Sequence, residues 1–413
     1  MHLSSTPTAH SLSSDWEAKV TYNYRNATDD TRLLYAYSST NTLNDDNTGL
    51  YGWLYSSHTV TENHLLDVNI SGYFQAFGQE HNLIAGGSYS HENVDTDVND
   101  YDTAIYLYLP LPAFPYLGNA YPEPQWYSGE PRSSSEQALT RVYAASRLSI
   151  TSRLKFIAGL NASRLEREGS SRYGSVVTNE STPDTQELSP YAGITFDFTD
   201  NILGYVSYSD IFLNQDQTDF DGHYLDPTKG VNIEAGIKAE WFDQKLLTTL
   251  AVFQLEQQRL ATYAGINDDG EYYYVPMDVE SKGFEIEITG RIGEHAKLTL
   301  GLTHLEITDP NGDDIYEWVP RTTINALFST RMPMLPELKM RISGRWQSDT
   351  KGDYAKQDAY MVVNGFANYD LTEETTVRVN INNIFDEKYV GGLAYGAIYG
   401  EPTSVLVSLD YKF

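Results

Sequence analysis

The chain of 413 residues contains no cysteine, so no disulfide and no thiolate chemistry is available to it. Zinc sites that need cysteine ligands are excluded with them. Basic residues are also scarce, because 28 Lys and Arg stand against 57 Asp and Glu, a net charge of −29. Nucleic-acid binding depends on a basic surface, so this balance argues against a nucleic-acid partner. An acidic surface of this size suits the attraction of cations or simple solubility.

Long apolar stretches are missing as well. No run of 18 or more apolar residues occurs, so the sequence predicts no transmembrane helix. Its first residues lack a charged segment followed by an apolar core, so no signal peptide is predicted within it. A composition this polar is typical of soluble proteins, and also of membrane barrels in which every second residue of a strand faces water.

The motifs of common enzymes are absent too. The nine His form no H-E-x-x-H pair, and there is no G-x-S-x-G, P-loop or dinucleotide fingerprint. Asp309 opens a stretch like a calcium loop, but Asp314 stands where such loops need glycine and Pro320 where they need glutamate. Glu285 and Glu287 share one strand face, as polar lining residues do. We therefore predict no enzymatic activity, no metal site and no cofactor.

What the sequence does have is alternation with a period of two. Counting back in twos from Phe413 gives Tyr411, Leu409, Val407 and Val405, whereas the residues between them are mostly polar. The segment Val231–Trp241 alternates in the same way, and charged residues fill its second face. Such strands have a different solvent on each side. The polar side faces bulk water in a sandwich, or the lumen in a large barrel.

The connections between these strands alternate between short and long from residue 77 onwards. This order is typical of an up-and-down transmembrane β-barrel with tight turns on one side and long loops on the other. We predict an all-β, antiparallel barrel of about 16–18 strands, with Asp15–Phe77 forming two long strands or four shorter ones. The expected long loops are Val94–Ser135, Glu168–Gln186, Asn214–Lys229, Gln258–Tyr272, Thr308–Trp318, Ser348–Gln357 and Asp386–Pro402.

Tyrosine is unusually frequent, with 32 Tyr against 15 Phe and 6 Trp, which suits membrane interfaces and binding loops. In the proline-rich stretch Tyr101–Pro131, aromatic rings can stack on a planar or catechol-like ligand, and the arginine that follows can meet an anion. Alternatively, this loop packs on itself or on a neighbouring loop. The candidate ligand-binding residues are Tyr116, Tyr121, Trp126, Tyr127, Arg132, and a second cluster of Tyr263, Tyr272, Tyr273 and Tyr274.

Several segments in the second half of the chain together resemble one known family. They occur in the order in which the family has them, and the last two look like its penultimate and final strands. The chain resembles TonB-dependent outer-membrane receptors, in particular the ferric-siderophore branch. The segments are Leu225–Trp241, Leu250–Leu255, Val279–Ile288, Trp318–Arg321, Val379–Tyr389 and Tyr411–Phe413. One departure is that Pro402 is followed by Thr403, where the family commonly has arginine.

The resemblance implies a receptor of which this chain is one portion. The family begins with a signal peptide, a TonB-contacting segment and a plug that fills the lumen, and none of these is visible here. We expect residues 1–14 to be a disordered or truncated remnant and 15–413 to be a β-barrel domain without its first strands. A wall that lacks strands leaves unpaired edges in lipid, so it must re-close or be completed by another polypeptide.

The function implied by the resemblance is ferric-siderophore uptake in the outer membrane of a Gram-negative bacterium. Iron would arrive as part of the bound siderophore, and the TonB complex would act only through the missing plug. Outer-membrane lipid and the barrel-assembly machinery are the other expected partners, and Tyr411 and Phe413 form the expected assembly signal. The alternatives are a passive porin-like channel and a soluble all-β enzyme or carbohydrate-binding protein.

Overall fold

The computed structural model describes residues 2–40, 42–116, 121–353, 355–394 and 396–412. Nineteen strands belong to one hydrogen-bonded sheet, and the strand pairs with a described register are antiparallel. The one helix within these ranges is α1 (Thr103–Tyr106). None of the helical segments described is long and apolar enough to cross a membrane. The predicted all-β, antiparallel fold class is confirmed.

The chain divides into two compact units. The first unit contains Met1–Phe74, Asn82–Ala145 and Leu160–Leu188, and the second contains Gln75–His81, Ser146–Gly159 and Ser189–Phe413. Several strands therefore contribute residues to both units.

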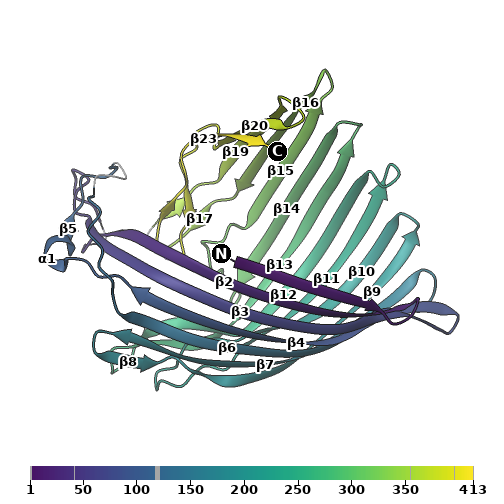
Figure 1. The fold of residues 1–413 in the computed structure, drawn as a ribbon, viewed down its shortest axis with the longest axis horizontal. Coiled ribbons are helices and arrows are strands. Elements are labelled where there is room, and N and C mark those ends of the chain that lie inside the picture. The colour runs from purple at the N-terminus through teal and green to yellow at the C-terminus, as the bar shows by residue number, and fades with distance from the viewer. Residues whose placement is uncertain (1, 41, 117–120, 354, 395, 413) are drawn as a thin grey trace. The chain divides into compact units, whose positions relative to one another are not determined.

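The first unit is built from long strands that follow one another in the sheet (Figure 1). β2 and β3 pair without a break in register from Trp16, opposite Gly72, to Tyr37, opposite Tyr51. Of the two alternatives for Asp15–Phe77, the one with two long strands is thus confirmed. The strands that begin in or pass through this unit are β1 (His2–Ser11), β2 (Trp16–Tyr37), β3 (Tyr51–Ala76), β4 (Gln79–Val98), β5 (Leu109–Pro110), β6 (Pro131–Ser149), β7 (Leu154–Tyr173), β8 (Val176–Asn179) and β9 (Thr182–Thr199).

The N-terminal residues differ from the expectation of a disordered remnant. Residues His2–Ser11 form β1, which pairs along its whole length with β2. The strand was not predicted because Ser and Thr fill half of its positions, so no apolar alternation marks it.

The second unit is a run of neighbouring antiparallel strands, and β10 to β16 lie side by side in Figure 1. Two small hairpins, β17 with β18 and β21 with β22, stand in its loops. Its elements after β9 are β10 (Ile202–Leu213), β11 (Thr228–Trp241), β12 (Leu246–Ile266), β13 (Tyr272–Ile292), β14 (Ala296–Thr308), β15 (Thr322–Met332), β16 (Leu335–Gln347), β17 (Thr350–Lys351), β18 (Lys356–Gln357), β19 (Tyr360–Asp370), β20 (Thr375–Asn382), β21 (Val390–Gly392), β22 (Ile398–Tyr399) and β23 (Ser404–Tyr411).

The alternation of short turns and long loops is confirmed in order, but two predicted loops are largely strand. β12 continues to Ile266, so the connection to β13 is only 267–271 rather than Gln258–Tyr272. Within Glu168–Gln186, β7 continues to Tyr173, β8 follows, and β9 begins at Thr182. The register of β12 with β13 shifts between Gln257 and Leu260 and again between Tyr263 and Gly265. These irregularities interrupt the alternation with a period of two, so the sequence did not predict the extension of β12.

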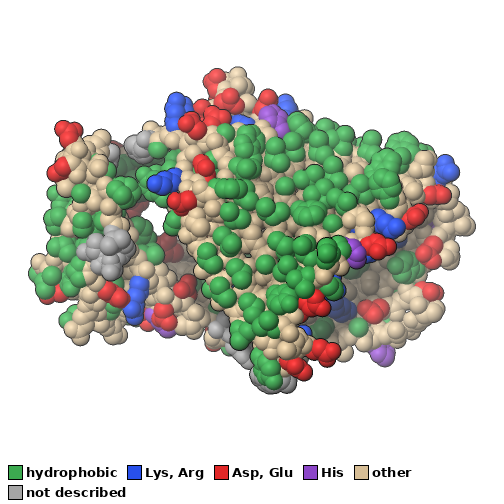
Figure 2. All heavy atoms as spheres, turned by 90° about the horizontal axis from the view of Figure 1, so that it is seen from above, with side chains coloured by type: hydrophobic (Ala, Val, Ile, Leu, Met, Phe, Trp, Pro, Cys, Tyr) green, Lys and Arg blue, Asp and Glu red, His purple; other side chains and the backbone are tan. Residues whose placement is uncertain are grey.

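Within the described residues, the buried hydrophobic side chains form only a small cluster, Leu54, Leu111 and Tyr121, and no extended dry core. Among the described residues, nine hydrophobic side chains are buried, whereas many more large ones are exposed, including Val206 (53%), Val252 (55%) and Leu409 (67%). Figure 2 shows hydrophobic side chains gathered in a broad field, with charged side chains mainly at its borders. A soluble β-sandwich packs such faces against each other, so this distribution argues against that alternative.

Candidate functional site

The sheet of the second unit has two faces of opposite character, and the register fixes which residues share each face. What we call the apolar face includes Val206, Ile237, Leu250, Val252, Ile286, Ile324 and Ile342. What we call the polar face includes Glu234, Lys238, Glu285, Glu287, Thr299, Thr303, Asn325, Ser343, Arg345 and Asn364. Neighbours along one strand therefore meet different surroundings.

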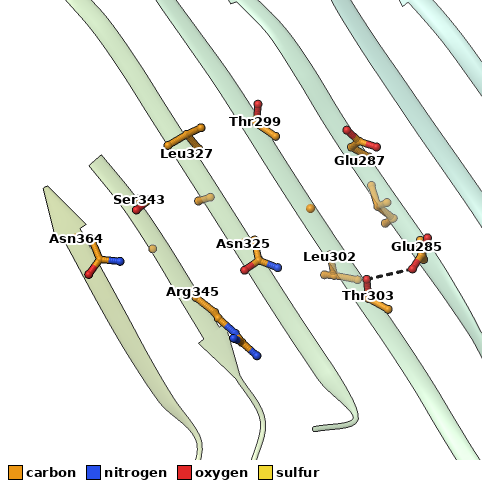
Figure 3. A pocket seen from close by; sticks show the side chains of 14 residues that line it. Glu285, Glu287, Thr299, Leu302, Thr303, Asn325, Leu327, Ser343, Arg345 and Asn364 are labelled. Atoms are coloured by element: carbon orange, nitrogen blue, oxygen red, sulfur yellow. Dashed lines mark hydrogen bonds between the residues drawn. The ribbon is translucent and has the colours of Figure 1, made fainter. Parts of the chain in front are cut away.

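A shallow hollow of about 470 Å³ lies along β13 to β19, where polar-face side chains come together (Figure 3). The Thr303 hydroxyl donates to Glu285 Oε1 at 3.4 Å, and Asn325 pairs in register with Arg345. Glu285 and Glu287, which the sequence placed on one face, do share it, two positions apart on β13. The hollow offers hydrogen-bonding and charged groups in a water-accessible wall.

On the same face, the ring of Tyr205 lies across its neighbouring strand. The Tyr205 hydroxyl donates to Glu234, and Lys238 Nζ lies 5.3 Å from the centre of the ring. Gly236 makes this close approach possible, because a Cβ there would stand 2.6 Å from the ring.

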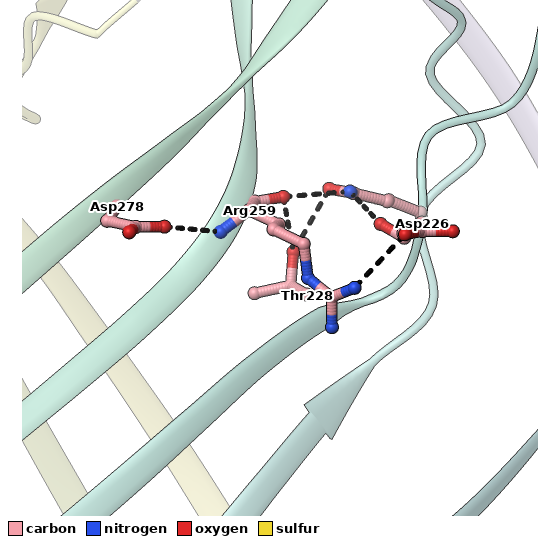
Figure 4. Close-up of polar contacts among 5 residues, drawn as sticks. Asp226, Thr228, Arg259 and Asp278 are labelled. Carbon is pink, nitrogen blue, oxygen red and sulfur yellow. Dashed lines mark hydrogen bonds and ion pairs between the residues drawn. The ribbon is translucent and has the colours of Figure 1, made fainter.

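At the loop end of β10 to β13, a polar network that includes the buried side chains of Gln215 and Thr228 surrounds Arg259 (Figure 4). Arg259 has a left-handed backbone, φ +60°, at the bulge of β12. Its amide donates to Asp278 Oδ1 (2.9 Å), its carbonyl accepts from Gln215 Nε2 (2.9 Å), and its guanidinium donates to Asp226 Oδ2 (3.1 Å). Gln215 Oε1 accepts from the Thr228 hydroxyl (3.0 Å) and the Ala261 amide (3.1 Å). The network thus ties the 214–227 loop to the bulge.

We expect Gln215→Ala to lower the free energy of unfolding by about 2 kcal/mol, because the buried Thr228 hydroxyl and the half-buried Ala261 amide lose their acceptor. The measurement is urea unfolding of the chain in detergent micelles. Gln217→Ala, two residues along the same loop and half-buried, is the control and should change stability by less than about 0.5 kcal/mol. Equal losses for the two variants would show that Gln215 does not organise the bulge.

The second predicted tyrosine cluster does come together, beyond this network. The Tyr263 ring lies 5.7 Å from that of Tyr272 and 6.1 Å from that of Tyr274, in edge-to-face geometry. Tyr273 instead packs on Phe220 of the 214–227 loop, at 5.1 Å. Tyr263 and Tyr272 are 56% and 64% exposed, so their rings remain available to a ligand.

Two acidic turns lie in the loops of this unit. Asp309 Oδ1 accepts from the amides of Asn311 and Asp313, and the bond from Asp313 is the main reason that the pKa of Asp309 is lowered. Asp219 Oδ1 accepts in the same way from the amides of Asp221 and His223. These bonds close the turns on themselves, which is the ordinary role of Asp in a loop.

The predicted aromatic loop of the first unit packs mainly on itself and on β3. Tyr121 is 8% exposed, clusters with Leu54 and Leu111, and donates its hydroxyl to the Tyr106 carbonyl. Its burial raises the pKa of the Tyr121 hydroxyl. Trp126 lies edge-to-face on Tyr101 at 5.6 Å. These contacts agree with the alternative of a self-packed loop for two of the five candidates.

The other three candidates of this loop are more peripheral. Tyr116 lies edge-to-face on Phe114 at 6.1 Å and is half-buried. Tyr127 is 51% exposed, and its backbone bridges to Asp100. Arg132, at the start of β6, is half-buried. Of the two residues in the expected assembly signal, Tyr411 is 62% exposed in β23, and Phe413 lies outside the described residues.

Sequence reasoning missed a second group of aromatic residues in the first unit, on β2 and β3. Consecutive cross-strand pairs place Tyr35 opposite Trp53, with ring centres 5.5 Å apart, and Tyr37 opposite Tyr51, at 6.1 Å. Tyr55 lies on the same face, opposite Leu33. We call Tyr35, Tyr37, Tyr51, Trp53 and Tyr55 the aromatic ladder. The signal for it was present in the matching alternation of Leu33–Tyr37 and Tyr51–Tyr55.

The ladder continues a polar face. Earlier on β2 and β3, the same side carries Lys19 opposite Asn69 and Thr21 opposite Asp67. The reverse side carries Val20 opposite Val68 and Tyr22 opposite Leu66. Trp53 and Tyr35 are 50% and 47% exposed, so these two rings of the ladder are open to water. The other three are half-buried, and Tyr37 lies edge-to-face on Tyr108 at 6.4 Å.

A sheet that exposes hydrophobic side chains across one face and polar ones across the other is the wall of a membrane β-barrel. The chain belongs to the family described as TonB dependent receptor-like, β-barrel, which matches residues 3–384. It is therefore an outer-membrane protein of the Gram-negative type, and the predicted family and location are confirmed.

Curated relatives agree with this assignment. The ferric-pyoverdine BN7/BN8 receptor of Pseudomonas putida is 31% identical over 97% of this chain and 50% of its own length. The ferripyoverdine receptor of Pseudomonas aeruginosa is 26% identical over 86% of this chain and 45% of its own length. The chain spans about half the length of the curated relatives it matches.

Solved structures share the fold. The ferripyoverdine receptor of the outer membrane of Pseudomonas aeruginosa, bound to ferripyoverdine, superposes with a TM-score of 0.81 at 24% identity, covering 100% of this chain and 56% of that one. The siderophore receptor PiuA from Acinetobacter baumannii gives a TM-score of 0.81 at 19% identity, covering 100% of this chain and 64% of that one.

Proposed function

We propose that this chain supplies barrel wall and outer loops to a receptor that takes up a ferric siderophore across the outer membrane. The relatives are named as receptors for ferric pyoverdines and, for one in Salmonella typhimurium, ferrioxamine B. Iron enters as part of the chelate, so the protein itself needs no metal ligands and no cofactor. The TonB complex energises transport through a plug segment of the whole protein.

The observation that carries this proposal is the aromatic ladder. β2 begins at Trp16, directly after the turn that joins it to β1, and Tyr35 lies nineteen positions further along. The ladder is therefore about 60 Å from that turn, measured along the strand. An apolar band about 25 Å tall spans the membrane, and strands tilt by about 40°, so the ladder stands well beyond it on the loop side. Water-exposed Tyr and Trp rings at that height suit stacking on a planar or catechol-like chelating group.

The loop candidates extend the proposed binding surface in each unit. In the first unit these are Tyr116, Trp126, Tyr127 and Arg132, and the last of them supplies a cation for an anionic chelate. In the second unit they are Tyr263, Tyr272, Tyr273 and Tyr274. Tyr121 is left with a packing role because its ring is enclosed.

The proposal is tested with ferripyoverdine, the ligand named for two relatives. We expect Trp53→Ala and Tyr35→Ala each to weaken binding by about 30-fold, the effect of losing a central aromatic contact. The measurement is fluorescence titration of the chain in detergent micelles with the iron-loaded siderophore. Tyr22→Ala, on the opposite face of β2, is the control and should bind like the unsubstituted chain.

Two results would contradict the proposal. One is unchanged affinity in both ladder variants, which would move the ligand elsewhere. The other is an ion conductance in planar bilayers with no saturable binding of ferripyoverdine or ferrioxamine B, which is the behaviour of a passive channel.

For assembly in the membrane, we propose that the apolar face contacts outer-membrane lipid. The C-terminal strand, with Tyr411 and Phe413, is the segment that the barrel-assembly machinery would bind. In support, the exposed side chains of β23 on the apolar face are Val405, Val407, Leu409 and Tyr411.

A further inference from the structure

The polar face of the second unit changes sign along its strands. Nearer the loops it carries Glu234, Glu285 and Glu287, whereas basic residues gather at the turn end of β13 to β20. We call this cluster the basic patch, and it consists of Arg291, Lys297, Arg331, Lys339, Arg341 and Arg378. In a chain with 28 basic residues and a net charge of −29, so dense a group of cations stands apart from the rest of the protein.

The register shows that these residues form one continuous surface. Arg291 lies opposite Lys297, and Ser329 separates Lys297 from Arg341 across the sheet. In the next row towards the turns, Arg331 lies opposite Lys339, and Asn368 separates Lys339 from Arg378. A hollow of about 390 Å³ opens here, lined by Lys297, Arg331, Lys339, Arg341 and Phe366 among others.

Most of this positive charge is not neutralised within the described part of the chain. Lys339 pairs with Asp370 at 3.3 Å and Arg378 with Asp410 at 3.0 Å. The remaining four, namely Arg291, Lys297, Arg331 and Arg341, form no ion pair within 4 Å of a described carboxylate. Arg291 Nη2 donates to the Glu294 carbonyl at 3.4 Å, but the carboxylates of Glu294 and Glu337, in the flanking turns, form no ion pair with the patch among the described residues. Like charges on neighbouring strands repel, so an anion bound here relieves that cost.

We propose that the basic patch binds an extended acidic polypeptide segment, rich in Asp and Glu, along the turn end of the polar face. From β13 to β20 the patch crosses five strand spacings, about 24 Å. A single phosphate or sulfate reaches only two or three of these cations, whereas carboxylates spaced along an extended segment reach all of them. The Phe366 ring, 5.8 Å from the Arg341 guanidinium, adds an apolar contact for such a segment. This inference does not depend on the ligand proposed for the loops.

The test uses the whole chain in detergent micelles and a fluorescent twelve-residue peptide of alternating Asp and Ser, followed by fluorescence anisotropy. We expect binding that weakens steeply as salt rises, because exposed charges are screened. The triple substitution Lys297→Gln, Arg331→Gln and Arg341→Gln should weaken it by about tenfold or more. The control removes three exposed cations elsewhere, through Arg153→Gln, Arg172→Gln and Lys388→Gln, and should change affinity by less than about twofold.

Charge reversal provides a second, independent variant. The double substitution Arg331→Glu and Arg341→Glu should abolish binding of the acidic peptide and create binding of a matched Lys-Ser peptide. Far-UV circular dichroism verifies that each variant is folded. If the triple variant does not fold, Arg341→Gln alone replaces it and is expected to weaken binding about threefold. Equal affinity of the triple and control variants would overturn the proposal. So would complete displacement of the peptide by 10 mM inorganic phosphate, which would make the patch a small-anion site.

Discussion

Val252→Arg is expected to lower the free energy of unfolding in lipid vesicles by about 2–4 kcal/mol, the cost of an arginine on the lipid side near the middle of a bilayer. Val252 lies on β12 six positions after Leu246, the first residue of that strand beyond the turn. Its side chain is 55% exposed on the apolar face. In lipid, the guanidinium there has no water and no carboxylate partner, so the folded membrane state loses stability.

The matched control is Thr249→Arg on the same strand. Thr249 lies on the polar face, in register with Glu287 on one side and Lys238 on the other. An arginine there stands in water beside a carboxylate, so we expect a change of less than about 1 kcal/mol. Urea titration of both variants in vesicles measures the difference. If Thr249→Arg costs as much as Val252→Arg, the two faces do not meet different solvents.

Asn383→Ala is expected to cost about 3 kcal/mol, because one buried side chain holds both ends of the 383–403 loop. Asn383 is 3% exposed and has a left-handed backbone, φ +48°. Its Nδ2 donates to the carbonyls of Glu387 and Glu401, each at 2.9 Å, and its Oδ1 accepts from the Glu387 amide at 2.9 Å. Alanine removes all three bonds and fits the left-handed backbone less well.

Two further variants define the cause of this loss. Asn382→Ala removes an exposed neighbour whose side chain bonds only across to Ser404 in the described contacts, and should cost less than about 1 kcal/mol. Asn383→Asp keeps the acceptor but turns a carboxylate oxygen towards two carbonyls, so it should be about as damaging as alanine. Thermal unfolding in detergent measures all three. Full stability of Asn383→Asp would show that the two donated bonds do not hold the loop.

This network also explains the segment Val379–Tyr389, which carried much of the family resemblance. Thr403 occupies the position where the family commonly has arginine, and its hydroxyl donates to the Asn383 carbonyl. Its amide donates to Asp386 Oδ1 at 3.1 Å. The departure from the family pattern is therefore accommodated by bonds that tie β23 back to the start of its preceding loop.

The sequence was sufficient to predict the two faces, because a period of two is a local property that each strand shows by itself. Glu285 and Glu287 were assigned to one strand face without any knowledge of their neighbours, and the register confirms it. The order of turns and loops was predictable for the same reason, since Gly, Asn and Asp mark chain reversals locally.

Features that depend on distant partners were missed. The extension of β12 past Arg259 depends on Gln215, which comes from another loop. The aromatic ladder depends on a register that places Tyr35 opposite Trp53 across a long connection. The burial of Tyr121 against Leu54 likewise follows from how its loop folds back on β3. A local pattern, such as the matching alternation of Leu33–Tyr37 and Tyr51–Tyr55, does not by itself specify which residues pair.

The central claim is that the apolar face meets lipid while the polar face meets water, and the absence of native cysteine allows it to be measured residue by residue. Cysteine is introduced at one position at a time, from 284 to 289 on β13, and each variant is treated in proteoliposomes with a membrane-impermeant maleimide. The account predicts rapid labelling of positions 285, 287 and 289, protection of 284, 286 and 288, and the inverse pattern with a lipid-soluble maleimide. Labelling that is uniform along the strand with both reagents would contradict it.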